Sequence, residues 1–490
     1  MAQSVKVNFI LNLINIGTQM LFPIVTFPYV CRVIGPEGIG QVSFFQSIIS
    51  YITLFTCLGI PMYAVREIAR VRNDIVSMNK TAIEILLFHL LLTILGYLVV
   101  SVLCIVVPQI HANTPLFLVL SLTILFTAFG CEWFYQGIED FKYITIRGLI
   151  VKFISLGLLF VFVKTKEDLI YYGFYTVFGI LGGNIFNFFR LRKYIKKKNV
   201  IFSQLRIFRH TKPILVIFSF NAVTSIYLQL NPVILGFLKD SISVGYFAAA
   251  TKIMGMVKNL SICLGTVMMP RVSNLWAENR REEFKILIQK SYDFTILFSL
   301  PLAVAVIVTA HSLIKVLCGD EFEPAVLTSQ IIAPIILIVG VANVMGIQAL
   351  YPMGKIKLVT YSCCVGAVVD LILCLSLIPF FGDRGAAVSY FMAEITTAVS
   401  MFFMGRKYLP IQYLKVQHLL YLIGCLLMAI IVGLVPYVLS VSDIYVLVVQ
   451  AIVGIIVYFA FLYMVKDSMT INCISKIVQK IGLHNKELYD

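Results

Sequence analysis

Charged residues are scarce in this sequence. Only 13 % of its 490 residues are Asp, Glu, Lys or Arg, whereas 60 % are hydrophobic. A soluble domain carries about 25 % charged residues, so a water-soluble fold is excluded for most of the chain. Apolar runs of about 20 residues recur from end to end, which is long enough to cross a hydrocarbon layer of about 30 Å. Most of this chain therefore has lipid as its solvent.

The sequence patterns of common enzymes and metal sites are also absent. Gly354-Lys355 lacks the upstream Gly and the following Ser or Thr of a phosphate-binding loop. The six histidines are scattered, with no H-E-x-x-H, and no cysteine pair has metal-ligand spacing. The 11 cysteines are an odd number and fall mostly within apolar runs, so we expect reduced, structural thiols. We therefore expect no enzyme and no bound cofactor.

The apolar runs predict an all-α polytopic membrane protein with about 14 transmembrane helices. They are too long and continuous for the alternating strands of a membrane barrel. The first run is too long, and too poor in basic residues before it, for a cleaved signal peptide. The predicted spans are 5–31, 40–62, 82–107, 115–136, 143–163, 168–190, 213–238, 243–270, 293–318, 326–352, 356–379, 384–406, 414–438 and 442–465.

The net charge of +15 is divided unevenly between the two sides of the membrane. With a cytoplasmic N-terminus, 30 of the 39 Lys and Arg residues fall in inner segments and six in outer loops. This positive-inside bias predicts a multi-pass membrane protein with both termini in the cytoplasm. The basic segment 190–212 is explained by topology and contact with anionic lipids, and we expect no nucleic-acid partner.

An internal repeat divides the chain into similar halves. F-P-Y-V-C-R-V-I-G-P-E-G-I-G-Q-V-S-F at 27–44 is echoed at 231–248, F-Y-Q-G-I-E-D-F-K at 134–142 is echoed at 350–357, and R-K-Y occurs at both 192–194 and 406–408. Their offsets are 204, 216 and 214 residues, which predicts two pseudo-symmetric six-helix lobes around a central path opened by rocking. The predicted parts are 1–212, a first lobe with a basic cytoplasmic loop; 213–407, a second lobe; and 408–490, helices 13 and 14 with an amphipathic tail.

Polar residues recur on single faces of the first two helices of each lobe. These stripes are Asn8, Asn12, Asn15 and Gln19; Gln46, Ser50, Thr53 and Cys57; Asn221, Thr224, Ser225, Gln229 and Asn231; and Lys252, Asn259 and Thr266. Hydrogen bonds between helices explain any one of them. All four together favour a water-filled central cavity.

Ionisable residues within the spans indicate what such a cavity would bind. Lys252 and Lys258 lie deep in the eighth helix and Arg32 at the outer end of the first, so an anionic cargo is expected. Snorkelling toward the cytoplasm is the alternative for Lys258. Asp370 and Glu394 could carry coupling protons or a sodium ion, or could pair with lysines.

E-W-F-Y-Q-G-I-E-D-F-K-Y-I-T-I-R at 132–147, the segment that begins at Phe27, and P-M-Y-A-V-R-E-I-A-R at 61–70 resemble the bacterial polysaccharide transporter (Wzx-type) family. This family belongs to the multidrug/oligosaccharidyl-lipid/polysaccharide exporter superfamily. The resemblance implies a flippase of the bacterial inner membrane for oligosaccharides on undecaprenyl pyrophosphate, such as O-antigen, capsule or exopolysaccharide repeat units. It also implies a glycan polymerase and chain-length machinery as partners, and it marks Arg32, Arg66 and Glu67 as candidates.

Glu132 and Trp133 are predicted to close the fourth helix at its cytoplasmic end. One interpretation is structural: Trp133 and Tyr135 form an interfacial belt, and Gln136-Gly137 makes the turn. The other is a gate in which Glu132 binds a basic group such as Arg66 or Arg147.

Several other functions compete with this interpretation. A multidrug exporter shares the architecture but is expected to place unpaired acids in its cavity, and a lipid II flippase differs only in its cargo. A membrane glycan polymerase or glycosyltransferase should carry a large loop or catalytic domain. A structural scaffold would not need polar stripes in both lobes.

Overall fold

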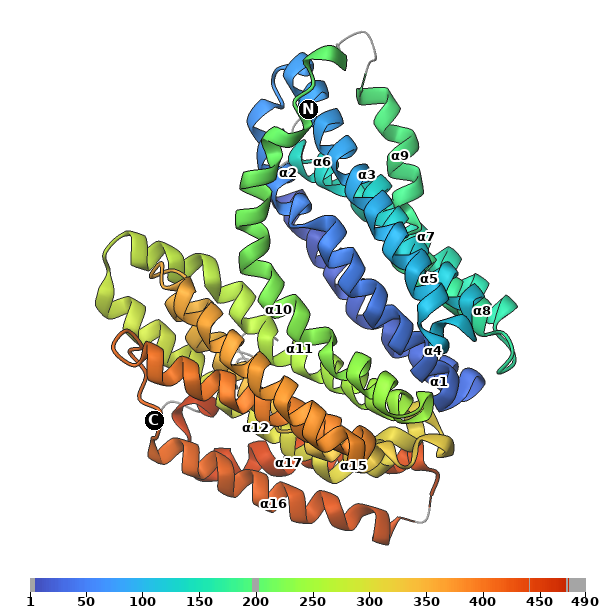
Figure 1. Ribbon diagram of the computed structural model, residues 1–490. Helices are drawn as coiled ribbons and strands as arrows, with labels where there is room; N and C mark the ends of the chain where they lie inside the picture. The colour runs from blue at the N-terminus through green and yellow to red at the C-terminus, as the bar shows by residue number, and fades with distance from the viewer. Residues whose placement is uncertain (1–4, 196–201, 440, 473–474, 476–490) are drawn as a thin grey trace. The chain divides into compact units, whose positions relative to one another are not determined.

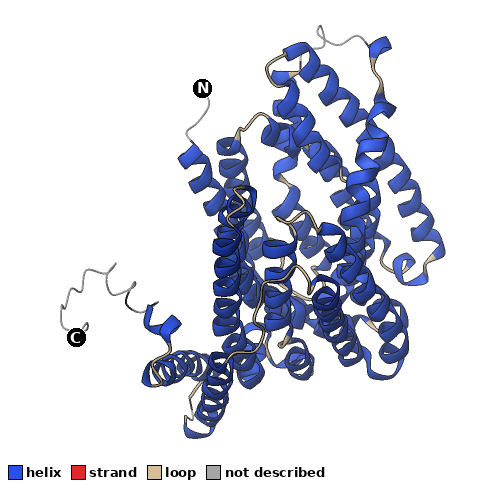
Figure 2. Ribbon diagram, turned by 90° about the vertical axis from the view of Figure 1, so that its left-hand side faces the viewer, coloured by secondary structure: helices blue, strands red, loops and turns tan. Residues whose placement is uncertain are grey.

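The structure, a computed structural model, is helical throughout its described part. The described residues are 5–195, 202–439, 441–472 and 475. Within them only helices, turns and loops are present (Figure 2), and the prediction of an all-α membrane protein is confirmed. The side chains of some helical residues lie outside the described part, among them Asn8, Asn12, Asn15, Gln19 and Asn221.

The chain divides into two compact units, Met1–Ala248 and Ala249–Asp490. Unit 1 contains α1 (Val5–Cys57), α2 (Ile60–Val71), α3 (Ile75–Val106), α4 (Pro108–His111), α5 (Thr114–Gly130), α6 (Glu132–Gly137), α7 (Phe141–Phe162), α8 (Leu169–Leu181), α9 (Gly183–Tyr194), η2 (Phe202–Gln204), η3 (Ile207–His210) and α10 (Thr211–Leu238). Helix α11 (Ser241–Ala277) begins in unit 1 and continues into unit 2. Unit 2 then contains α12 (Arg281–Cys318), η4 (Asp320–Phe322), α13 (Ala325–Ile332), α14 (Ile335–Asn343), the π-helical η5 (Val344–Leu350), α15 (Ile356–Gly405), α16 (Val416–Val438) and α17 (Asp443–Met464), as drawn in Figure 1.

Helices α1 and α15 each hold two membrane passes joined at a glycine. A straight helix of 50 residues would be about 75 Å long, more than twice the thickness of the hydrocarbon layer. In α1 the break is at Gly35 (φ 75°, ψ 177°), and in α15 it is at Gly382 (φ 57°, ψ −128°). Glycine adopts a positive φ without the steric cost of a Cβ atom. In α15 a Cβ on Gly366 would strike the hydroxyl of Thr397, so the two halves lie against each other as a hairpin.

The number of passes agrees with the sequence prediction. Nine described helices are long and apolar enough to span a membrane, or ten if α8 and α9, bent by 42°, form one span. The first half of α1, the second half of α15, and the partly described α10 and α11 bring the total to about 14, which confirms the prediction.

Two glycines of the sequence repeat meet inside unit 1. A Cβ on Gly40 would strike the carbonyl oxygen of Ser241, and one on Gly245 would strike that of Pro36. Ser241 lies 205 positions after Pro36, and Gly245 lies 205 positions after Gly40. The contact therefore joins matched positions of the repeat, and such a close backbone approach requires residues without side chains.

The fourth predicted span, 115–136, agrees with the apolar span Thr114–Gly137, but this span is broken in two at Cys131. Helix α5 stops at Gly130, because Cys131 adopts a left-handed conformation (φ 44°), and α6 is a separate short helix. The turn then includes Glu139 (φ 61°) rather than Gln136-Gly137, which is helical.

The aromatic residues of α6 are buried, so the interpretation as an interfacial belt is wrong. Trp133 is 3 % exposed and Tyr135 is fully buried. Both belong to a core cluster that includes Tyr63 and Ile68 of α2. The Tyr135 hydroxyl donates to the backbone oxygen of Asn187 on α9 (2.7 Å), so these rings bind α6 to the protein rather than to lipid.

Candidate functional site

Glu132 pairs with one of the two arginines that the sequence suggested. Its carboxylate lies 3.3 Å from the guanidinium of Arg147 on α7, and Gln136 donates to it at 3.3 Å. The Arg147 side chain is only 10 % exposed and fits against Gly183, which has no side chain to obstruct it. Glu132, Arg147 and Gly183 all lie in unit 1, so the pair fastens α6 to α7 inside this unit.

Arg66 takes part in a different network on α2. The Glu67 carboxylate, largely buried, lies 3.0 Å from Arg70 and 3.5 Å from Arg66. The two arginine side chains are exposed, at 74 % and 68 %. The R-E-I-A-R motif therefore presents two cations at the end of α2, held by the buried acid between them.

A second buried acid, Glu84 on α3, holds the segment that leads from α9 into α10. Its carboxylate accepts hydrogen bonds from the backbone N–H of Arg206 (2.8 Å) and from Nε2 of His210 (3.1 Å), and it pairs with Arg209 (2.6 Å). His210 Nδ1 in turn lies 2.7 Å from the Tyr63 hydroxyl, so the neutral imidazole that carries its proton on Nε2 can donate to Glu84 and accept from Tyr63. We call this network the Glu84 clamp.

Unit 2 contains a network of the same kind around Asp293 on α12. The Asp293 carboxylate accepts from Nζ of Lys415 (2.6 Å) and from Nε2 of His418 (3.1 Å). Gln289 also donates to it, at 2.7 Å. Lys415 and His418 stand where the connector from α15 enters α16, and we call this network the Asp293 clamp.

The two clamps occupy matched positions of the repeat. Glu84 and Asp293 are 209 positions apart, and His210 and His418 are 208 apart. Both offsets lie within the range of the three sequence landmarks. Each clamp joins a buried acid on an early helix of its unit to a histidine and a cation in a later connector. The role of these acids and histidines was not predicted, although the spacing of 208 residues between His210 and His418 matches the repeat.

Burial lowers the pKa of His210 below its usual value, and the Glu84 carboxylate opposes this shift. The nearby Arg209 guanidinium adds to the lowering. A lowered pKa favours the uncharged imidazole near neutral pH, and this form can make the hydrogen bonds with Tyr63 and Glu84.

The candidate cations of the eighth predicted helix do not share a face. Lys252 and Asn259 are exposed on α11, seven positions apart and thus on one side. Lys258 lies about 120° around the helix and lines a small space with Thr251 and Tyr390 inside unit 2. Of these residues, Lys252 and Asn259 are the ones that face away from the packed core of unit 2.

The remaining first-lobe candidates lie on α1. Arg32 is exposed just before the Gly35 break and has interactions of its own. Gln46 is half-buried in the second half of the helix, where its backbone oxygen accepts from Ser50 (2.7 Å).

The acidic candidates of the second lobe come together across the α15 hairpin. Asp370 on the first half is fully buried, and Glu394 on the second is 8 % exposed. Both lie beside the Tyr390 hydroxyl, and the Cys374 thiol contacts Asp370 at 3.6 Å. The hairpin thus forms a buried polar cluster inside unit 2, with Lys258 on its border.

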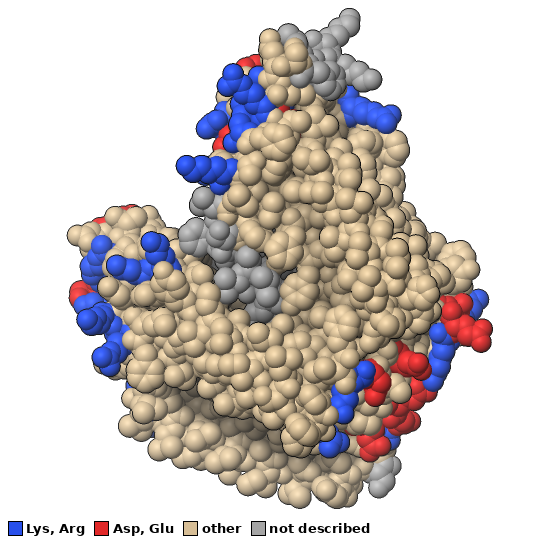
Figure 3. Space-filling view, in the orientation of Figure 1, with Lys and Arg blue, Asp and Glu red and all other residues tan. Residues whose placement is uncertain are grey.

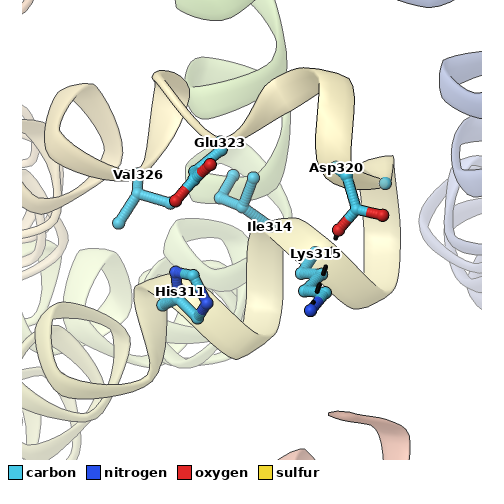
Figure 4. Close-up of a pocket in the computed structure, with 7 residues that line it drawn as sticks. His311, Ile314, Lys315, Asp320, Glu323 and Val326 are labelled. Carbon is cyan, nitrogen blue, oxygen red and sulfur yellow. Dashed lines mark ion pairs between the residues drawn. The ribbon is translucent and has the colours of Figure 1, made fainter.

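One end of α12 carries a solvated ion cluster, of which Figure 4 shows Lys315 and Asp320. Lys315 pairs with Asp443 (3.2 Å) and Asp320 (3.8 Å) beside a pocket of about 250 Å³ that His311 and Glu323 also line. No group of three or more His, Cys, Asp or Glu side chains in the described residues is arranged to hold a metal ion.

The fold is that of known membrane transporters. A structure titled lipid II flippase MurJ, inward closed conformation, matches 92 % of this chain and 99 % of its own, with a TM-score of 0.65 at 16 % identity. An inward-facing multidrug resistance transporter of the MATE family, in the MOP superfamily, matches 79 % of this chain and 94 % of its own, with a TM-score of 0.65 at 12 % identity. These similarities establish the fold.

Sequence comparison establishes the family. A proposed O-antigen transporter of Escherichia coli (strain K12) is 25 % identical over 397 residues, covering 80 % of this chain and 95 % of the relative. One of Shigella dysenteriae is 24 % identical over 399 residues, covering 81 % and 98 %. The MatE family model matches residues 216–375, and the model described as polysaccharide biosynthesis protein matches residues 5–276, more than half of the chain. This multi-pass membrane protein therefore belongs to the polysaccharide biosynthesis protein family, of the Wzx type within the multidrug/oligosaccharidyl-lipid/polysaccharide exporter superfamily.

Proposed function

We propose that this protein is a flippase that moves an oligosaccharide on undecaprenyl pyrophosphate from the inner to the outer leaflet of the bacterial inner membrane. The observation that carries this proposal is the match to two O-antigen transporters over 95 % and 98 % of their lengths. Alternating access between the two lobes would expose the sugars to water on one side at a time.

The exposed face of α11 supports an anionic cargo. Lys252 lies on this face with Asn259, is exposed, and forms no ion pair within the described residues. An ammonium group there would bind a pyrophosphate by charge-assisted hydrogen bonds, and the amide would bind sugar hydroxyls. Arg32 would contribute from the outer end of the first pass.

Coupling to an ion gradient would use the polar cluster of the α15 hairpin. Asp370 and Glu394 can accept a proton or contribute oxygen ligands to a sodium ion. Glycan transport into inverted vesicles, driven separately by a proton or a sodium gradient, tests this role. Asp370→Asn should abolish the dependence on the coupling gradient, and an unchanged dependence would exclude Asp370 from coupling.

The decisive experiment for the flippase is leaflet-resolved labelling of lipid-linked glycan in cells that lack the protein. Accumulation in the inner leaflet, reversed by the wild-type gene and not by Lys252→Gln, is the expected result. An unchanged distribution in cells without a second transporter would contradict the proposal. Accumulated lipid II in place of a repeat-unit lipid would instead identify a lipid II flippase, and a loss of drug export alone would identify a multidrug exporter.

The proposed function also predicts the orientation of the protein in the membrane and its partners. Both termini would lie in the cytoplasm, where the basic segments would contact anionic lipids, and a glycan polymerase with its chain-length machinery would receive the product. Labelling of single cysteines placed near each terminus, in intact and permeabilised cells, tests the orientation.

A further inference from the structure

A large pocket at one end of unit 2 has no role in the proposed transport path. It has a volume of about 1160 Å³ and is bounded by the first turns of α12, the connector 409–417, and the segment 468–472 after α17. Figure 3 shows Lys and Arg side chains gathered at this end of unit 2, where α11 meets α12. We call it the α12 pocket.

Three lysines, Lys285, Lys290 and Lys415, line the α12 pocket, against one acid, Asp293. Asp293 and Lys415 neutralise each other within the Asp293 clamp. Lys285 pairs with Glu282 (2.7 Å) in an exposed contact, which water and salt screen strongly. Lys290 is exposed and forms no ion pair within the described residues. The pocket therefore keeps a net positive charge after its internal pairs are formed.

The clamp alone does not explain the remaining lining of the pocket. In unit 1 the matched clamp holds its connector with Glu84, Tyr63, the histidine and the cation. The α12 pocket adds further amide groups, which do not hydrogen-bond to the Asp293 carboxylate, and an apolar wall, of which only Leu409 and Ile411 pack the connector into the core of unit 2. The amide groups belong to Gln412, Gln417 and Asn472, and the apolar side chains to Ile286, Phe294, Leu409, Ile411 and Met469.

Cations beside an apolar wall recognise an amphiphile. Helix α12 has 38 residues, about 57 Å, and is longer than the hydrocarbon layer of about 30 Å, so its first turns, which carry Lys285 and Lys290, extend from the apolar part of the helix toward the headgroups. Ile286, 55 % exposed, continues the apolar surface toward the lipid. A phosphate could bind the lysines and amides while its glycerol and first methylene groups contact Ile286 and Phe294.

We propose that the α12 pocket binds the headgroup of an anionic glycerophospholipid through its phosphate. The volume accommodates a headgroup with its glycerol, and the charge selects anionic over zwitterionic lipids. This site is separate from the exposed face of α11 and does not depend on which glycan the protein carries. A negative result in the transport assay would therefore not bear on the proposal that the α12 pocket binds a lipid.

The test uses the full-length protein, stripped of lipid in detergent and titrated with phosphatidylglycerol, phosphatidylcholine or inorganic phosphate. The shift in unfolding temperature against concentration gives an apparent affinity for each. Phosphatidylglycerol should bind best, and Lys290→Gln should weaken it about fivefold and Lys285→Gln/Lys290→Gln about 25-fold. Lys212→Gln, which removes an exposed lysine from the start of α10 in unit 1, is the matched control and should change nothing.

Each alternative outcome overturns the proposal in a distinct way. Equal affinity in the double variant and the control would show that lipid binds elsewhere. Equal stabilisation by phosphatidylcholine would show that charge takes no part. Stabilisation by inorganic phosphate at the same concentrations would identify a site for free phosphate rather than for a lipid.

Discussion

Replacing Glu84 by Ala should loosen the connector between α9 and α10 and destabilise unit 1. The carboxylate is fully buried and satisfies three partners: the backbone N–H of Arg206, Nε2 of His210 and the guanidinium of Arg209. Removing one member of a buried ion pair costs about 3–5 kcal/mol. Arg209 is 45 % exposed and can return to water, which reduces this cost.

The His210 imidazole is buried, and leaving its donor unsatisfied costs about 1–3 kcal/mol, whereas the part-buried backbone N–H of Arg206 loses one hydrogen bond, worth about 1 kcal/mol. We expect a total loss of about 2–4 kcal/mol for Glu84→Ala. For Glu84→Gln we expect about half of that, because the amide keeps one acceptor and the volume of the side chain.

Thermal unfolding in detergent, followed by limited proteolysis of the connector, measures both effects. Glu139→Ala is the matched control, since it breaks an exposed pair with Arg72 (2.6 Å) in the same unit, worth at most about 1 kcal/mol. If Glu84→Ala unfolds at the same temperature as Glu139→Ala and its connector is cleaved no faster, the clamp does not stabilise the fold.

Three further predictions follow from other contacts. Gly366→Ala should lower the unfolding temperature, since its Cβ would strike the opposing half of α15 at a cost of about 1–3 kcal/mol, whereas Gly157→Ala, with open space beside it, should be neutral or slightly stabilising. Burial lowers the pKa of His210, so the unfolded chain binds the proton more tightly; the free energy of unfolding should fall as the pH drops below about 6.5, and His210→Gln should flatten this dependence in a melting series. Glu132→Gln should leave membrane insertion intact but impair glycan transport in a complementation assay, because the Arg147 guanidinium loses its ionic partner; normal transport would remove the gate hypothesis.

The positions of the membrane passes were predictable from the sequence, because the lipid environment requires a long apolar segment for each pass. A span must be apolar over about 20 residues, so composition alone located the passes, including the two halves of α1 and α15. The repeat was likewise recognisable from three short pairs of similar segments. The close contact between Gly40 and Gly245 explains why glycine occurs in one of these pairs.

Contacts between distant segments were not predictable in the same way. Glu84 and His210 are 126 positions apart, and Asp293 and His418 are 125 apart, so neither pair forms a local pattern. Trp133 was misassigned because an aromatic residue at the end of an apolar run looks the same whether it faces lipid or protein. Only the packing of α6 against α2 decides between them.

The Glu84 clamp also determines where this protein can be cut and recombined. The segment 206–210 precedes the second lobe in the sequence, but its hydrogen bonds belong to α3. A chimaera that takes its first six passes from a related transporter must therefore bring its own residues through His210. A junction placed before Arg206 would join an acid from one parent to a histidine from the other. The matched junction in the second lobe lies after His418, so a transplantable module is six passes together with the connector that follows them.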